Sequence, residues 1–297
     1  MAAVSAALAS IPSPSTGVYH LGPFTLHMYG LMLLLAIAGA LWLTGKRWVR
    51  FGGDWDLVFR VAIYGVIAGI VGARVYHDIT SWNQDSAIHA HWYGPFAVWS
   101  GGLGIWGAIP LGVLAGAWVV RRSGNSIRLF MDAVAPGLLL AQGIGRWGNW
   151  FNQELYGKPT NLPWALKIDP AHRPANDLGH ATYQPTFLYE FLWDSLGVAL
   201  LLWIDRRFKL RRPGLFALYV AYYSAFRMVE ETLRIDPSSH FGGMRLNFWV
   251  ALACFLGSAG FFVWWQFLRD PTAVPPKAKP RPLPQGPRMS VPKGRVR

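Results

Sequence analysis

Cysteine and charged residues are scarce in this chain of 297 residues. A single cysteine, Cys254, excludes an intramolecular disulfide and argues against catalysis by a thiol of the chain itself. Charged residues make up only 14% of the sequence, whereas a soluble domain usually carries about 25%. Hydrophobic residues reach 53%, and the mean hydropathy is +0.24. This composition excludes an ordinary soluble domain and predicts an all-α integral membrane protein.

Seven apolar stretches are long enough to form membrane helices, which need roughly 20 mostly apolar residues. They cover residues 24–45, 57–76, 97–120, 130–150, 186–204, 214–233 and 246–268. We therefore expect a transmembrane catalytic domain of seven helices over residues 24–268, with an external loop or cap at about 151–185. The expected flanking regions are an external segment, 1–23, and a tail, 269–297.

Acidic residues are outnumbered by basic ones, 15 against 28, which gives a net charge of +13. The basic residues cluster after the first, third, fifth and seventh stretches: Lys46, Arg47 and Arg50; Arg121, Arg122 and Arg128; Arg206, Arg207, Lys209, Arg211 and Arg212; and the tail. The positive-inside rule then places the N-terminus outside and the C-terminus in the cytoplasm. This topology explains much of the charge, so we expect no nucleic-acid partner.

The tail, residues 269–297, is rich in proline and in basic residues. This composition is typical of disordered segments. Its charges are interpreted either as a solvated run that reinforces the topology or as an attraction to anionic membrane lipids.

Many ionisable residues lie inside or at the ends of the apolar stretches. They are Arg60, Arg74, Asp132, Arg146, Glu154, Glu190, Asp194, Arg227, Glu230, Glu231 and Arg234. Such residues are expensive in a bilayer and usually face a cavity or one another, so they mark pathways or sites. Any single one can also be half of a buried ion pair. As a set, they predict a functional site.

Two groups of polar residues stand out. The first is Arg146, Asn149, Asn152 and Glu154, in which Arg146 and Asn149 share a helical face if the helix persists there. The second is "FRMVEETLR", in which Arg227, Glu231 and Arg234 fall on one stripe and Glu230 lies off it.

Two interpretations of the second group remain open at this point: a structural triad, or a phosphate clamp. Arginine suits phosphate because its planar fork donates two parallel hydrogen bonds. Both groups lie at the outer ends of their helices in the topology above. Together they predict an anionic site in the outer half of the membrane.

The stretch "GRWGNWFNQELYG", residues 145–157, closely resembles the signature of the prolipoprotein diacylglyceryl transferases, with Trp150 where phenylalanine is usual. Further matches to that family follow in order along residues 25–265. They are "MYGLM" from Met28, "GGLGIWGA" from Gly101, Asp132 ahead of the signature, "PTFLYE" from Pro185, and "FRMVEETLR". Without the resemblance, the glycines of "WSGGLGIWGA" are equally well explained by tight helix packing.

The resemblance implies a seven-span enzyme of the bacterial inner cell membrane. The enzyme would transfer the diacylglyceryl group of phosphatidylglycerol to the lipobox cysteine of prolipoproteins, form a thioether and release glycerol phosphate. The implied partners are phosphatidylglycerol, prolipoprotein signal peptides with a lipobox cysteine, and membrane lipids. The resemblance implies no cofactor and no metal.

The resemblance also assigns residues. Arg146 and Arg227 would hold the phosphate and stabilise the charge that grows on it, and Glu231 would complete this catalytic group. The implied substrate-binding residues are Tyr29, Ser100, Gly101, Gly102, Asp132, Asn149, Asn152, Glu154, Gly157 and Arg234.

Two positions depart from the family pattern. Ser100 and Gln184 stand where the family commonly has histidine, so the proton acceptor for the thiol is not assigned. The candidates are Glu231, Glu154, water, His180, or the arginines acting through their field alone. A transporter or scramblase for anionic lipids is the alternative function, because it would also need intramembrane arginines. A structural scaffold is a further alternative, and no Ser–His or paired-aspartate arrangement favours a membrane protease.

Overall fold

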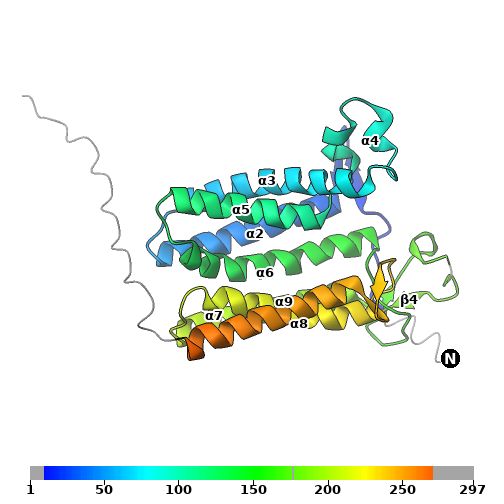
Figure 1. Cartoon of the computed structure of the whole chain (residues 1–297). Coiled ribbons are helices and arrows are strands. Elements are labelled where there is room, and N and C mark those ends of the chain that lie inside the picture. Colours follow the sequence, from blue (N-terminus) through cyan, green and yellow to red (C-terminus); the bar gives the residue numbers. More distant parts are fainter. Residues whose placement is uncertain (1–9, 176, 270–297) are drawn as a thin grey trace, which may run out of the picture.

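The computed structural model describes residues 10–175 and 177–269, and this part of the chain contains seven helices of 18 residues or more. They are α2 (Met28–Arg50), α3 (Trp55–Ser81), α5 (Ile105–Arg122), α6 (Ile127–Asn152), α7 (Thr186–Arg207), α8 (Gly214–Leu233) and α9 (Leu246–Val263). A turn of π-helix, Trp264–Leu268, continues α9. Figure 1 shows these helices side by side along a common direction.

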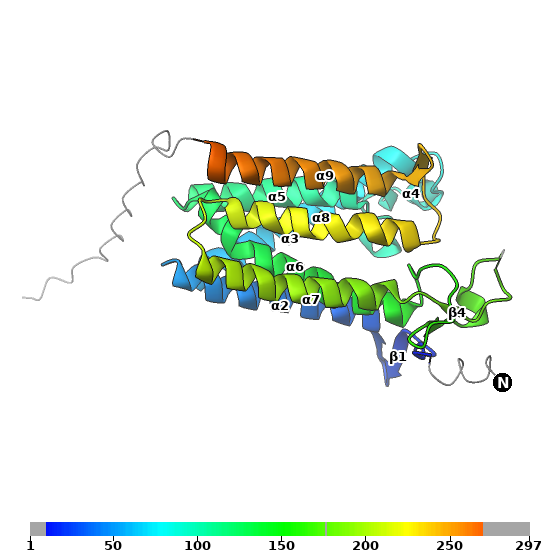
Figure 2. The ribbon, with the colours of Figure 1, turned by 90° about the horizontal axis from the view of Figure 1, so that it is seen from below.

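Short elements gather at one end of the bundle (Figures 1 and 2). Three antiparallel hairpins pair β1 (Val18–Leu21) with β2 (Phe24–His27), β3 (Leu166–Lys167) with β4 (Thr182–Tyr183), and β5 (His240–Phe241) with β6 (Met244–Arg245). A short helix, α4 (Ala87–Ala90), lies between α3 and α5. Two of the hairpins lead directly into α2 and α9. The hairpins and α4 therefore mark the end of the bundle that we expect to be external.

Within the described residues, five helices are long and apolar enough to cross a membrane: α2, α3, α6, α7, and α9 with its π-helical turn. The chain is therefore a multi-pass membrane protein. For α5 and α8, crossing stays a prediction. The helix α5 spans 18 residues and ends in two arginines, whereas α8 carries a charged cluster near its own end.

Two boundaries differ from the sequence prediction. Residues 24–27 form strand β2 rather than the start of the first helix, since Phe24–His27 pair with β1. The third helix begins at Ile105 rather than at residue 97. The intervening backbone turns through Gly101 and Gly102, with φ angles of 87° and 66°. Glycine adopts this left-handed region readily, and a helix cannot continue through it.

The helices associate in pairs, chiefly α3 with α5, α2 with α6, α6 with α7, and α8 with α9. Gly72 of α3 and Gly107 of α5 let one pair approach very closely. A Cβ atom added to Gly107 would lie only 2.0 Å from the Gly72 carbonyl oxygen. Small residues are the usual means of close helix packing in membranes. The packing interpretation of the glycine-rich stretch is thus confirmed for Gly107.

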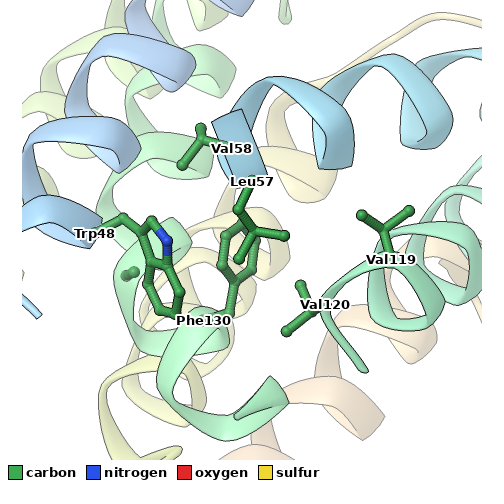
Figure 3. Close-up of a cluster of buried hydrophobic side chains, with 7 residues drawn as sticks. Trp48, Leu57, Val58, Val119, Val120 and Phe130 are labelled. Atoms are coloured by element: carbon green, nitrogen blue, oxygen red, sulfur yellow. The ribbon is translucent and has the colours of Figure 1, made fainter. Parts of the chain in front are cut away.

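The largest buried hydrophobic cluster lies at the opposite end of the bundle, where α2 leads into α3 and α5 leads into α6 (Figure 3). Trp48 and Phe130 pack edge to face with ring centroids 5.2 Å apart, and Leu57 lies against them. Side-chain caps begin two of these helices: Asp54 accepts from the Leu57 N–H at 2.9 Å, and Ser126 accepts from Leu129. This cluster fixes the scaffold far from the hairpins.

Candidate functional site

The centre of the site is an ion pair between α6 and α7. Arg146 Nε lies 2.7 Å from Glu190 Oε2, and Arg227 Nη1 of α8 lies 4.0 Å from the same oxygen. Glu190 is fully buried, whereas the side chains of Arg146 and Arg227 retain 18% and 16% of their exposure. Three helices therefore bring two partly accessible guanidinium groups to one buried carboxylate.

Arg227 is also paired along its own helix. Its two terminal nitrogens contact Glu230 and Glu231, at i+3 and i+4. Both spacings place side chains next to each other on a helix surface. The prediction that Glu230 lies off the stripe of charged residues was therefore wrong, because that stripe is wide enough to include it.

The network continues beyond the end of α8. Arg245 Nε lies 2.6 Å from Glu231 Oε2, and Arg245 Nη2 lies 2.8 Å from Asp236 Oδ2. Arg234 holds the same aspartate with both Nε and Nη2, at 2.7 and 2.9 Å. Arg234 follows the last residue of α8 with an extended backbone. The predicted helical stripe is therefore wrong for Arg234, which joins the network through Asp236 instead.

Asp236 makes this outer part of the network sensitive to acid. Burial alone would raise the pKa of its carboxyl group, but hydrogen bonds and charge from Arg234 and Arg245 outweigh burial and lower the pKa. A lowered pKa in the folded state contributes stability above the unfolded-state value, which is about 3.9 for aspartate. That contribution is lost as the pH falls through the folded-state value.

We therefore expect Asp236→Asn to lower the melting temperature at pH 7 and to flatten its decline below about pH 4, the usual aspartate range. Thermal unfolding of the detergent-purified protein at a series of pH values measures both effects. The control is Asp56→Asn, since Asp56 is 74% exposed in its pair with Arg60. If the melting temperature of Asp236→Asn declined at low pH as steeply as that of the wild type, the prediction would be contradicted.

The signature residues at the end of α6 form a hydrogen-bonded chain. Arg146 Nη1 donates to Asn149 Oδ1 at 3.4 Å, so the predicted shared face is confirmed. Asn149 and Asn152 both donate to Glu154 Oε1, at 2.9 and 3.3 Å. Gly157 follows and pairs by backbone with Arg234, beyond α8. The signature thus links the Arg146 guanidinium to the loop and to the second charged group.

Tyr29, at the start of α2, packs onto the signature at Gly148. A Cβ atom added to Gly148 would lie 2.7 Å from Tyr29 Cδ2. The glycine between Arg146 and Asn149 therefore provides the space that the tyrosine ring occupies.

Gly148→Ala is expected to destabilise the protein by about 1–3 kcal/mol, the usual effect of overpacking, and to lower any activity that needs Tyr29 in place. Thermal unfolding and the assay described below measure the two effects. Tyr29→Ala should relieve the clash, so the double variant should recover stability relative to Gly148→Ala. Gly145→Ala is the matched control, because a Cβ atom at Gly145 meets nothing within 4 Å.

The described N-terminal residues form a wall of the site. The Trp150 indole donates to the Pro12 carbonyl at 3.2 Å, and Gln153 Nε2 donates to that of Pro14 at 2.9 Å. Gln153 caps the end of α6 with a left-handed φ of 51°. Residues 14–18, the end of α6 and His172 enclose a polar pocket of about 370 Å³ that includes Asn152 and Glu154. The described part of the predicted external segment is therefore packed against the signature, and residues 1–9 of that segment lie outside the described residues.

Asp132 is not brought to this site. It lies 14 residues before Arg146 on the same helix, which is about 21 Å along the axis. Its side chain accepts from Arg212 at 3.2 Å and from the Phe216 N–H at 2.8 Å. Arg47 donates to its backbone carbonyl. These contacts join α2, α6 and α8 at the other end of the bundle, so the structure supports a structural role for Asp132.

Ser100, Gly101 and Gly102 lie in the connection between α3 and α5. The Gly101 carbonyl accepts from Arg74 Nη1 at 2.9 Å, and a Cβ atom added to Gly102 would lie 2.5 Å from the His77 ring. His77 Nε2 in turn lies 3.0 Å from Asp85 Oδ2. An imidazole oriented by a carboxylate therefore lies against the glycine loop. Neither glycine has a hydrogen bond to the arginine network within the described residues.

The other proton-acceptor positions are also placed by the structure. Gln184 accepts a hydrogen bond from the Tyr189 hydroxyl at 2.6 Å. His180 is exposed in the cap loop, beside Asp177. Neither side chain is joined by these contacts to Arg146 or Arg227.

The selection of site residues from the sequence missed Glu190, Arg245 and Asp236. The sequence places Glu190 only among the intramembrane acids, whereas its burial beside Arg146 places it at the centre of the arginine network. Arg245 had a signal of its own, since it is a lone arginine directly before the seventh apolar stretch, at its expected outer end. Only the folded hairpin β5–β6 carries it back to Glu231.

Most of this chain is similar in sequence to known proteins. A family model described as prolipoprotein diacylglyceryl transferase matches residues 16–264. Relatives named phosphatidylglycerol–prolipoprotein diacylglyceryl transferase include one from Frankia alni, 54% identical over 83% of this chain, which spans 65% of that relative. One from Streptomyces coelicolor is 51% identical over 86% of this chain and 81% of its own length. One from Cutibacterium acnes is 50% identical over 84% of each chain.

Proposed function

Because the chain belongs to the prolipoprotein diacylglyceryl transferase family, we propose that it transfers the diacylglyceryl group of phosphatidylglycerol to the lipobox cysteine of prolipoproteins. The cysteine sulfur attacks the glyceryl carbon that bears the phosphate. The carbon–oxygen bond to the phosphate breaks, a thioether forms, and glycerol phosphate leaves. The proton of the thiol passes to solvent, which balances the negative charge gained by the departing glycerol phosphate. The product is the first intermediate of lipoprotein maturation.

The observation that carries this proposal is the pair of arginines on Glu190. Their guanidinium groups keep part of their exposure while the carboxylate between them is fully buried. The carboxylate of Glu190 thus orients Arg146 through Nε, while Glu230 and Glu231 hold the terminal nitrogens of Arg227. Each guanidinium group has five N–H donors, so both keep donors for a ligand. Two such donors suit a phosphodiester and stabilise the negative charge that develops as glycerol phosphate departs. Neighbouring arginines also favour the thiolate form of the incoming cysteine.

The remaining signature residues position the head group in this proposal. Asn149 and Glu154, joined at 2.9 Å, offer a donor and an acceptor beside Arg146. Tyr29 presents its hydroxyl from the neighbouring helix, and Asn152 supports Glu154. Gly157 and Arg234 connect this group to the end of α8. Glu231 keeps Arg227 in place through their ion pair.

We further propose that all seven long helices cross the bacterial inner membrane, with the N-terminus outside and the C-terminus in the cytoplasm. The basic ends of α2, α5 and α7 and the basic sequence that follows α9 support this orientation, because positive residues are retained on the cytoplasmic side. Residues 24–268 then form the transmembrane domain, with the loop 151–185 outside and the tail 269–297 inside. The arginine network lies near the outer surface, where exported prolipoproteins are accessible.

The experiment uses the full chain purified in detergent, mixed with phosphatidylglycerol and a lipobox peptide. Peptide mass and released glycerol phosphate are followed together. We expect a diacylglyceryl mass gain that disappears with a Cys→Ser peptide and with Arg146→Ala. A folded protein that binds phosphatidylglycerol but yields neither product would overturn the proposal. It would favour the alternative of a lipid transporter or scramblase, which makes no product.

A further inference from the structure

A groove lies at the basic end of the bundle, opposite the arginine network. Its volume is about 610 Å³, and it is formed by the last turns of α7, the α7–α8 connection, α8 and the end of α9. Figure 1 shows the α7–α8 connection and the end of α9 at this end of the bundle. Glu190 lies near the beginning of α7, so the length of that helix separates the groove from the site described above.

The walls of the groove are aromatic and face outward. Trp203, Phe208, Phe262 and Phe267 line it, and Phe208 and Phe267 are 50% and 72% exposed. Trp203 and Phe208 pack edge to face with ring centroids 5.6 Å apart. In a multi-pass membrane protein, the surroundings of such side chains are hydrocarbon and the headgroup boundary. The groove therefore suits an acyl chain.

Two basic residues, Lys209 and Arg211, line the same groove. Within the described part of the chain, neither has an acidic side chain within ion-pair distance. Asp205, in the last turn of α7, pairs with Arg47 and Arg212 instead. Arg211 Nη1 donates to the carbonyls of Trp265 and Arg269 at 3.2 and 2.7 Å. These bonds fix one side of the guanidinium group, and its charge remains uncompensated by a carboxylate.

Gln266 makes this groove a built feature rather than a loose gap. Its Oε1 accepts from the Arg211 N–H at 2.9 Å, and its Nε2 donates to the Arg211 carbonyl at 2.7 Å. This paired contact locks the α7–α8 connection against the end of α9. The basic side chains and the apolar walls are thereby held in one geometry.

We propose that this groove binds one anionic phospholipid from the leaflet at the basic end. Its phosphate lies on Lys209 and Arg211, and an acyl chain runs along Phe208 and Phe267. Basic pockets between membrane helices recognise anionic head groups in this way. The site is separate from the substrate site, so its lipid is retained rather than consumed.

The test uses the full chain in detergent and dioleoyl phosphatidic acid, with dioleoyl phosphatidylcholine as the zwitterionic lipid of equal chain length. Native mass spectrometry counts bound lipids, and hydrogen exchange locates them. Phosphatidic acid should protect amides of residues 208–211 and 264–269, and phosphatidylcholine should not. Lys209→Gln should raise about fivefold the concentration of phosphatidic acid needed for this protection. This change corresponds to the contribution of one basic residue near a membrane surface.

The matched control is Arg207→Gln, since Arg207 is exposed and adjacent but does not line the groove. It should leave the protection unchanged, and both variants should transfer diacylglyceryl groups at the wild-type rate. Equal weakening by the two variants would mean a diffuse electrostatic attraction and overturn the proposal. Equal protection by both lipids would do the same. Protection that appears only after residues 270–297 are removed would assign the groove to the chain's own tail.

Discussion

Arg146→Gln should lower the rate of diacylglyceryl transfer about 10²- to 10³-fold, the usual effect of removing one preorganised donor to a developing negative charge. Glutamine cannot present a charged planar fork to the phosphate. The change also leaves Glu190, which is fully buried, without the cation 2.7 Å away. Orphaning one partner of a buried pair typically destabilises a protein by about 3–5 kcal/mol. Initial rates of glycerol phosphate release and thermal unfolding measure the two effects.

The double variant Arg146→Gln/Glu190→Gln separates the two effects. It removes both charges, so most of the stability should return while the transfer rate stays low. Arg146→Lys should give an intermediate rate, because lysine keeps the charge but lacks the second parallel donor. If the double variant regained activity, Arg146 would serve only to neutralise Glu190, and its assignment to the phosphate would be wrong.

Arg245→Ala should destabilise the protein by about 3–5 kcal/mol, because it removes charged hydrogen bonds to two acids at once, and each such bond contributes about 1.5–3 kcal/mol. Glu231 keeps its pair with Arg227, and Asp236 keeps its pair with Arg234. Glu231 is fully buried at 2.6 Å from Arg245, and Asp236 shares the same guanidinium group. Arg245 is a positioning residue, since it acts on Arg227 through Glu231. We therefore expect kcat to fall while the KM for the peptide changes little. Thermal unfolding and steady-state kinetics measure these effects.

The comparison for Arg245 is Arg60→Ala. Arg60 also pairs with an aspartate, but its side chain is 47% exposed and that of Asp56 is 74% exposed. Such exposed pairs usually contribute about 0–1 kcal/mol, so this variant should be nearly neutral. Arg245→Lys should restore part of the lost stability and rate. Similar losses in Arg60→Ala and Arg245→Ala would show that burial is not the cause.

Much of the bundle could be predicted from hydropathy and charge, because both depend on local composition. The failures occur where backbone conformation or distant contacts decide. Phe24–His27 are apolar enough to extend the first span, yet they pair with β1 because a tight turn brings the chain back. The third span loses its first turns to Gly101 and Gly102, whose positive φ angles no hydropathy average detects.

The site was predictable where its residues share one helix and not where they meet across helices. Helical spacing alone predicted the Arg146–Asn149 contact. It could not show that Glu190 of α7 lies between Arg146 and Arg227, since nothing in the sequence fixes how α6, α7 and α8 face one another. The resemblance carried Asp132 into the site, but helix geometry places it about 21 Å from Arg146 along α6. Helical spacing could not identify His77, because its neighbours Asp85 and Gly102 lie in the connection between α3 and α5.

The described N-terminal residues are synthesised well before the surface that they bind. Ser13 bonds to the carbonyl of Lys167, 154 residues further along, and Pro14 accepts from Gln153, 139 residues further along. Closing such long loops costs conformational entropy, and no contact offsets this cost until the distant partner is present. During biosynthesis this strip of chain therefore lacks its binding surface until α6 and the loop after it have been made. The polar pocket between residues 14–18 and the end of α6 is thus completed late, after four of the seven long helices have been made.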